Sequence, residues 1–408
     1  MAKSTKSHPI RKSLKPYPEF PLTAHPSGRW CKKRRGRQHY FGPINVDGDF
    51  EVAWKAAYQR YEREWPHILD GREPPPDGAE DGLTMAALCN EFLNSKRRQM
   101  DAGELSSRTW DDYRKTTDGL IAQFGGHRRV DDLRPDDFQT FRSKLAKRLG
   151  VVSVKNEVNR CRTVFKFASD QRLIERPVYY GQSFDRPSKK TIRKGRIEAG
   201  IRLFESDELR KILSACDPVM RALVLLGANC GFGNTDVANL PQSAVDLDEG
   251  WIEFPRPKTA IERRCPIWPE TVEALRVAIP QRPEPKDKDD ADCCFLTKRG
   301  NRWAGMVETE GDKPRMVKRD NVTVRFGKLL RKLNINGRPG LGFYTLRHVF
   351  QTIGGEAKDP EAVAAIMGHV DTSMGAVYRE RISDERLRDV VEIVREWLWP
   401  DDTGDDSK

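Results

Sequence analysis

Residues 344–378 read YTLRHVFQTIGGEAKDPEAVAAIMGHVDTSMGAVY and decide the fold expected for the C-terminal half of the chain. Four apolar residues recur there at helical spacing: Leu346, Val349, Phe350 and Ile353. This stripe predicts a helix that buries one face, and Arg347 is expected to point away from the core because it lies outside the stripe. The same reading predicts three short helices, at Thr345–Gly354, Pro360–Met367 and Ser373–Tyr378.

The sequence around this stretch predicts a domain that is mostly helical with one small antiparallel sheet. Three short segments alternate like strands, at Val245–Leu247, Trp251–Phe254 and Cys265–Trp268, and a loop with Lys258 joins the last two. Met220 to Ala228 is almost entirely apolar, which is typical of a buried helix. Further helices are predicted at Pro269–Ile279, Asn321–Leu333 and Asp384–Leu398. The last of these is expected to pack on its own domain or to reach a neighbouring subunit.

The N-terminal half divides at a stretch rich in proline, glycine and acidic residues, REPPPDGAEDG at 72–82. Before it, a basic strand–turn–strand and a helix at Phe50–Trp65 are expected. After it, four helical patterns are predicted: Met85–Lys96, Ser107–Phe124, Pro135–Leu149 and Ser153–Gln171. The basic stretch RPSKKTIRKGRIEAGIR at 186–202 lacks an apolar pattern and is predicted to be an extended linker.

The expected fold class is therefore mainly α, or α+β. It combines a helical DNA-binding domain of the core-binding, SAM-like type with a mixed, mostly helical catalytic domain that carries a small antiparallel sheet. The length of 408 residues favours several domains. The predicted order is a basic flexible arm (1–24), a small basic module (25–71), a linker (72–82), the helical domain (83–175), a basic linker (176–202), the catalytic domain (203–400) and an acidic tail (401–408).

Composition narrows the function classes. Lys and Arg outnumber Asp and Glu by 72 to 61, which favours a polyanionic partner. No apolar run is long enough for a membrane span and no signal peptide is recognisable, so a cytoplasmic, nucleoid-associated protein is expected. The eight cysteines show neither a CxxC pair nor zinc-ligand spacing, and they are expected to be reduced. Cys293 and Cys294 are predicted to lie in a strand.

Three local strings carry a resemblance when they are taken together. They are Pro257-Lys258-Thr259 between two strands, Thr345-Leu346-Arg347-His348 at the start of a helix, and Gly368-His369 followed by Tyr378. Their order and spacing resemble the catalytic domain of tyrosine recombinases and phage integrases over residues 203–400. The helical domain is similar in size and position to the core-binding domain of that family. Residues 28–66 look like the arm-binding modules of some phage-type members.

The resemblance implies a site-specific recombinase that cleaves and rejoins DNA through a 3′-phosphotyrosyl intermediate, without a metal or cofactor. Tyr378 would be the nucleophile, and Arg347 would bind the non-bridging phosphate oxygens with its planar guanidinium. Lys258 would protonate the leaving 5′ hydroxyl. His369 would hydrogen-bond the same phosphate, and His348 would at most support it.

Two positions depart from the family pattern. Gly233 stands where the family generally has an arginine, with Asp236 at the position of the following acid, and the loss of such a donor typically costs about 3 kcal/mol of transition-state stabilisation. Tyr344 stands where the family usually has histidine, and its hydroxyl can still donate a hydrogen bond to phosphate. Two hypotheses accommodate Gly233: either the protein keeps the DNA-clamp architecture and has lost most of its chemistry, or a neighbouring donor occupies the vacant space. The candidates are Asn234, Arg263 and Arg264.

Two basic clusters are expected to contact DNA phosphates and to make binding depend on salt. Their members are Arg29, Lys32, Lys33, Arg34, Arg35, Arg37, Lys189, Lys190, Arg193, Lys194 and Arg196. Double-stranded DNA is the expected partner, with a monomer in free solution and a homotetramer assembled on DNA. Two alternatives stay open: a catalytically weakened or inactive DNA-binding protein on the recombinase scaffold, which Gly233 favours, and relaxation of supercoils without strand exchange. The sequence does not identify the mobile element that it serves.

Overall fold

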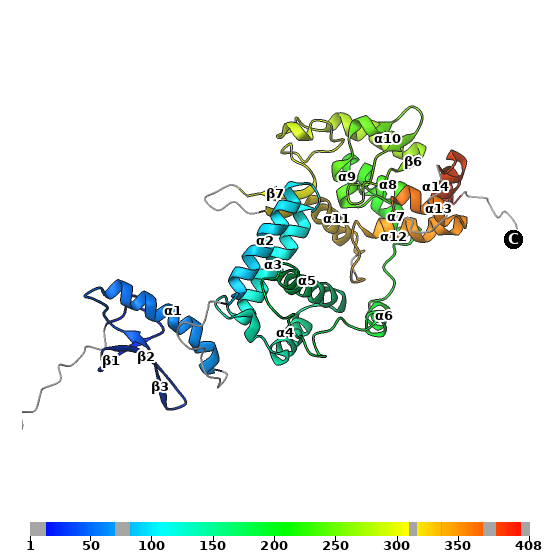
Figure 1. The fold of residues 1–408 in the computed structure, drawn as a ribbon. Helices are drawn as coiled ribbons and strands as arrows, with labels where there is room; N and C mark the ends of the chain where they lie inside the picture. Colours follow the sequence, from blue (N-terminus) through cyan, green and yellow to red (C-terminus); the bar gives the residue numbers. More distant parts are fainter. Residues whose placement is uncertain (1–13, 70–81, 310–315, 336, 370–380, 401–408) are drawn as a thin grey trace, which may run out of the picture. The chain divides into compact units, whose positions relative to one another are not determined.

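The computed structural model describes residues 14–69, 82–309, 316–335, 337–369 and 381–400. The chain divides into two compact units, residues 1–192 and 193–408, which are described separately below (Figure 1). Helices predominate in both units and every sheet is small and antiparallel, as the sequence predicts. Within the described ranges, no helix combines the length and the apolar character needed to cross a membrane.

The first unit begins with a three-stranded antiparallel sheet and one helix. Strands β1 (Thr23–His25), β2 (Arg29–Arg34) and β3 (Arg37–Pro43) pair in sequence order, and helix α1 (Phe50–Leu69) covers one face. The β2–β3 turn lies at Arg35 and Gly36, which both have positive φ, as a tight hairpin turn of this hand requires. The sheet and helix enclose an aromatic core with Phe20, Trp30 and Phe41.

Four helices form the second part of this unit: α2 (Met85–Asp101), α3 (Ser107–Phe124), α4 (Pro135–Arg148) and α5 (Val151–Asp170) (Figure 1). Helices α2 and α3 begin where they do because Thr84 and Ser106 accept hydrogen bonds from backbone N–H groups in the first turn. Phe138 lies at the centre of the core, with its ring within 5.5 Å of those of Phe124 and Phe165. The predicted helical stripe of α5 is buried against it.

The basic stretch predicted as an extended linker contains a helix, so that prediction was wrong for residues 189–198. Helix α6 (Lys189–Glu198) begins after Ser188, whose hydroxyl accepts a hydrogen bond from the N–H of Thr191 at 3.1 Å. No residue of α6 is buried, and its five basic side chains are exposed. A capped helix of Lys, Arg and Glu forms without an apolar stripe because these residues have high intrinsic helix propensity.

The second unit is built around helix α8 (Pro218–Cys230), ten of whose residues are buried. Helices α10 (Pro269–Ala278) and α12 (Thr345–Ile353) pack against it, while α7 (Ser206–Ser214) precedes it and α9 (Asn234–Asn239) follows it. Strands β4 (Val245–Asp246), β5 (Trp251–Glu253) and β6 (Arg264–Pro266) form an antiparallel sheet in sequence order. The buried Asn229 of α8 ties these parts together: its amide oxygen accepts the N–H of Trp268 at 2.8 Å.

The remaining elements include a hairpin that the sequence reading missed, β7 (Ala304–Glu308) and β8 (Met316–Asp320), which precedes helix α11 (Asn321–Lys332). Cys293 and Cys294 do not lie in a strand, because Cys293 forms only an isolated bridge with Pro241. All eight cysteines are described and free. Helix α13 (Pro360–Met367) follows α12 through a short 3-10 turn.

The C-terminal helix α14 (Asp384–Leu398) packs on its own domain. Its buried residues are Leu387, Val390, Val391, Val394 and Leu398, and they join the main core of the second unit. The indole N–H of Trp268 donates to the carbonyl of Val391 at 2.9 Å, and Arg395 pairs with Glu270. Of the two arrangements expected for this helix, the structure therefore shows the one within the same chain.

Candidate active site

Arg347 lies at the centre of the candidate site, in the first turn of α12, with a side chain that is only 2% exposed. The expectation that it points away from the core was wrong. Its Nη1 donates to the carbonyl of Gly231 and its Nη2 to the carbonyl of Met367, both at 2.6 Å. Gly231 ends α8 and Met367 ends α13. The guanidinium is buried because it satisfies carbonyls at two helix C-termini, where the helix dipole also favours a cation.

His369 is held beside this guanidinium. The Nη2 atom of Arg347 lies 2.9 Å from Nε2 of His369. Since arginine has only donors, Nε2 must accept, and the proton of the neutral imidazole is then on Nδ1. Burial first, and then the charges of Arg347 and Arg256, lower the pKa of His369 below 6.5. The ring is therefore neutral at pH 7, and its Nδ1–H has no hydrogen-bond partner among the residues that the structure describes.

Lys258 is exposed on the loop between β5 and β6. This loop is hydrogen-bonded to the backbone of Gly368, next to His369. The N–H groups of Thr259 and Ala260 both donate to the carbonyl of Arg256, which closes a tight turn around Lys258. Arg256 Nη1 and the Thr259 hydroxyl then donate to the carbonyl of Gly368, at 3.2 and 3.3 Å. The loop of Lys258 is thus attached directly before His369.

Gly233 is the N-cap of helix α9, and its N–H donates to Oδ2 of Asp236 at 2.7 Å. Its backbone is extended, with φ −93°, so a residue with a side chain could adopt the same conformation. A Cβ atom at this position would lie 3.1 Å from Cε2 of Tyr344. The ring of Tyr344, which is 49% exposed, therefore lies beside the place where the family carries its arginine.

The three side chains expected to replace that arginine as donors lie in different environments. Asn234 donates to Asp320 and Thr323 and so holds α9 to the start of α11. Arg264 lies on the surface, where it pairs with Glu253 and Asp384.

Arg263 is the one that enters the site, with a side chain that is 0% exposed. Its Nη2 lies 3.1 Å from Oδ1 of Asp236, an ion pair without hydrogen-bond angles, so neither terminal nitrogen has a hydrogen-bond partner among the described residues. Nε donates to the carbonyl of Phe254, and the guanidinium stacks 4.4 Å above the ring of Phe232. Arg263 is thus a buried counter-charge to Asp236.

Tyr378 and the predicted helix Ser373–Tyr378 lie outside the described residues, so the nucleophile stays a prediction. His348 lies on the exposed side of α12, with its ring 5.5 Å from that of Tyr344. Burial, Arg347 and Arg202 lower its pKa.

The sequence reading missed Arg256. Its one recognisable signal was its position two residues before Lys258, and this does not distinguish it from the other cations of the chain.

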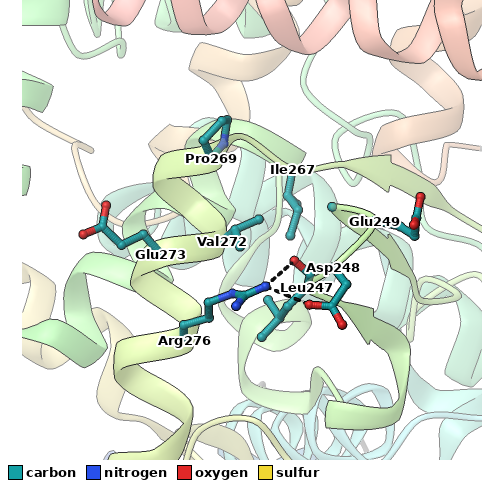
Figure 2. A pocket seen from close by; sticks show the side chains of 9 residues that line it. Leu247, Asp248, Glu249, Ile267, Pro269, Val272, Glu273 and Arg276 are labelled. Atoms are coloured by element: carbon teal, nitrogen blue, oxygen red, sulfur yellow. Dashed lines mark hydrogen bonds and ion pairs between the residues drawn. The ribbon is translucent and has the colours of Figure 1, made fainter.

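A shallow depression in the same unit lies away from these residues. It has a volume of about 360 Å³ between the β4–β5 turn and the start of α10 (Figure 2). Figure 2 shows Arg276 reaching across it to the carbonyl of Leu247 and to Asp248, with which it forms an ion pair at 2.8 Å. None of the candidate site residues lines it.

The basic residues predicted to contact DNA are mostly available at the surface. Arg29, Lys33, Arg35 and Arg37 are exposed on the β2–β3 hairpin. Lys32 is half-buried, because its amine donates to the hydroxyl of Tyr61 at 2.6 Å and lies 4.9 Å above the ring of Trp65. Arg34 donates to the carbonyl of Leu69 at the end of α1. These two residues therefore hold the module together.

Comparisons with known proteins concern the C-terminal domain and the overall fold. Residues 202–384 match the model of the phage integrase family. Among curated proteins, none matches the chain in sequence. In fold, the chain is similar to the integrase of transposon Tn1549 in complex with a circular intermediate DNA, with 16% identity, a TM-score of 0.53 and coverage of 76% of this chain and 99% of that one.

It is also similar to a lambda integrase dimer bound to a COC′ core site, with 14% identity, a TM-score of 0.53 and coverage of 92% and 98%. The lambda integrase tetramer bound to a Holliday junction matches with the same identity and coverage and a TM-score of 0.51. The domain at residues 202–384, which carries Arg347, His369 and Lys258, matches the phage integrase family, and the fold of the chain is similar to that of solved integrases.

Proposed function

We propose that this recombinase cleaves one DNA strand with Tyr378, assisted by Arg347, His369, Lys258 and Tyr344. The observation that supports it best is the hydrogen bond between Arg347 and His369, with the Lys258 loop attached to the preceding residue. This arrangement groups a fixed cation, a neutral donor and an exposed lysine that can serve as the acid around one backbone segment. Phosphoryl transfer to a tyrosine requires these three functions.

In the proposed cleavage step, the phenolic oxygen of Tyr378 attacks the scissile phosphorus and its proton passes to solvent. A phosphorus–oxygen bond to Tyr378 forms while the bond to the 5′ oxygen breaks. Lys258 gives its proton to that leaving oxygen, and the 3′ phosphate stays on the protein. Arg347 neutralises the charge on the non-bridging oxygens, and His369 and Tyr344 donate hydrogen bonds to them. Attack of a 5′ hydroxyl on the phosphotyrosine reverses the step and rejoins the strand.

Duplex DNA is the proposed partner, bound as a homotetramer during strand exchange by a chain that is monomeric when free. The domain layout predicted from the sequence places the basic hairpin of the 25–71 module and the basic helix α6 outside the catalytic domain. Their exposed cations suit phosphate contacts, which supply affinity without sequence preference. On this proposal, the protein acts on DNA in the cytoplasm, associated with the nucleoid.

The experiment that tests the function is covalent trapping. The full chain is incubated with supercoiled or nicked DNA and denatured, and DNA-linked protein is detected, with Tyr378→Phe as the matched control. An adduct that is lost in the Phe variant is expected. Salt-sensitive duplex binding without any adduct, on DNA libraries that include the element's own ends, would instead support the non-catalytic alternative that Gly233 suggested.

A further inference from the structure

Two arginines bind consecutive carbonyls at the end of helix α13. Arg347 donates to Met367 and Arg256 donates to Gly368, from elements that lie far apart in the sequence. Gly368 has a left-handed φ of 60°, which turns the chain out of the helix. The two guanidiniums are therefore both held against the backbone that leads into His369.

The charges of these two arginines are not balanced. Burial lowers the pKa of Arg347, and the charge of Arg256 is the next largest cause, so the two cations lie close enough to repel each other. The nearby carboxylate of Asp236 is already paired with Arg263. Among the described residues, neither Arg347 nor Arg256 forms an ion pair with a carboxylate. Adjacent cations of this kind bind an anion favourably, because the anion removes their repulsion.

Arg256 still has donors to offer such an anion. It is only half-buried, and its one hydrogen bond to described residues uses Nη1, which leaves Nε and Nη2 free. Arg263 differs, because its side chain is 0% exposed and its guanidinium is stacked on Phe232. Arg256, unlike Arg263, can therefore reach a ligand from solvent.

We propose that Arg256 supplies the phosphate contact that Gly233 has lost, donating to a non-bridging oxygen of the scissile phosphodiester beside Arg347. This inference rests on the proposed function. It places the second phosphate-binding arginine, Arg256, on the loop of Lys258. The proposed acid and one of the two phosphate-binding arginines then belong to the same loop. Gly233 then leaves space for the ring of Tyr344, and the site keeps two guanidinium charges, those of Arg347 and Arg256.

The competing explanation is that Arg256 only caps helix α13. Both explanations predict a slower Arg256→Ala variant, so the test needs a readout that a structural role would not change. A methylphosphonate at the cleaved bond provides it, because replacing one non-bridging oxygen by methyl removes the negative charge. A residue that neutralises this charge becomes dispensable on the neutral substrate, whereas a residue that holds the fold does not.

The experiment starts with the wild-type chain, whose adduct on supercoiled DNA maps the cleaved bond. Oligonucleotide duplexes with phosphodiester or methylphosphonate at that bond are then cleaved by wild type, Arg256→Ala, Arg256→Lys and the surface control Arg264→Ala. On the phosphodiester, Arg256→Ala is expected to lose about a hundredfold in cleavage rate, and on the methylphosphonate it is expected to come within about threefold of wild type. Arg256→Lys is expected to fall in between, and Arg264→Ala to match wild type.

The experiment distinguishes a failure of the role proposed for Arg256 from a failure of the proposed function. An Arg256→Ala variant that cleaves the phosphodiester at the wild-type rate, or that is equally slow on both substrates, would overturn the role of Arg256 and leave the proposed function standing. Thermal unfolding of each variant identifies a fold defect, and Arg256→Lys then decides between charge and packing. A wild-type chain that forms no adduct would overturn the proposed function itself, and this inference with it.

Discussion

Replacing Asp236 by Asn removes the carboxylate that faces the buried guanidinium of Arg263. The Arg263 side chain is 0% exposed and that of Asp236 is 10% exposed, so water cannot screen the charge that remains. Removing one partner of a buried ion pair typically costs about 3–5 kcal/mol. The amide oxygen of Asn can still accept the N–H of Gly233, so this cost comes from the unpaired cation rather than from a lost helix cap.

The neighbouring residue offers a matched control. Arg264 pairs with Asp384 at 2.9 Å, and the two side chains are 42% and 52% exposed. Asp384→Asn is therefore expected to cost no more than about 1 kcal/mol. Removing both charges of the buried pair, in Asp236→Asn with Arg263→Met, is expected to recover at least half of the loss, because no uncompensated charge then remains.

The assay is hydrogen exchange of the full chain, followed in peptides that cover helices α8 and α9. A loss of 3 kcal/mol or more raises the local opening constant by roughly a hundredfold or more, which exchange rates resolve. The reasoning would be refuted if the loss of local stability in Asp236→Asn lay within about 1 kcal/mol of the loss in Asp384→Asn. It would also be refuted if the double variant Asp236→Asn with Arg263→Met were less stable than Asp236→Asn alone.

Three further predictions concern the site and its partner. Gly233→Arg in the Arg256→Ala background is expected to restore at least about tenfold in adduct formation, because the half-exposed ring of Tyr344 can move aside; an equal rate with and without the new arginine would count against it. Because the folded-state pKa of His369 lies below its unfolded value, its stabilising effect is fully present above about pH 6.5 and is lost as the pH falls through the folded pKa. Denaturant midpoints at pH 7.5 and 5.5 should therefore differ more for wild type than for His369→Gln, and equal differences would contradict the assignment. Changing the five cations of α6 to Gln should flatten the plot of log affinity against log salt by up to about 4.5 units, and an unchanged slope would show that α6 does not contact phosphates.

Much of the helical framework was predictable from local patterns. The apolar spacing of a helix is a property of a few neighbouring residues, and the four helical patterns predicted after residue 82 match α2, α3, α4 and α5 to within five residues. The reading failed where no apolar pattern exists. Helix α6 buries nothing, and the β7–β8 hairpin has a partly charged second strand, so neither left a periodic signal.

The site divides in the same way. The order of Lys258, Arg347, His369 and Tyr378 along the chain was enough to indicate tyrosine recombinase chemistry and to show that Gly233 departs from it. The apolar periodicity nevertheless predicted that Arg347 points away from the core, whereas its side chain is buried. The prediction was wrong because the carbonyls that accept its hydrogen bonds are not neighbours in the sequence. Its acceptor on Gly231 is 116 residues away, at the end of another helix.

The local sequence thus determined most of the helices, since propensity, capping and apolar spacing act over a few residues, and its motifs indicated the chemistry. Only the tertiary structure decided which cations are buried, which are paired and which stay available to a phosphate. Arg256, Arg263 and Arg264 lie within nine residues of one another, yet one is half-buried with free donors, one is buried against Asp236 and one is on the surface. Burial and pairing depend on the helix ends and carboxylates that packing brings beside each guanidinium, and these come from distant parts of the chain.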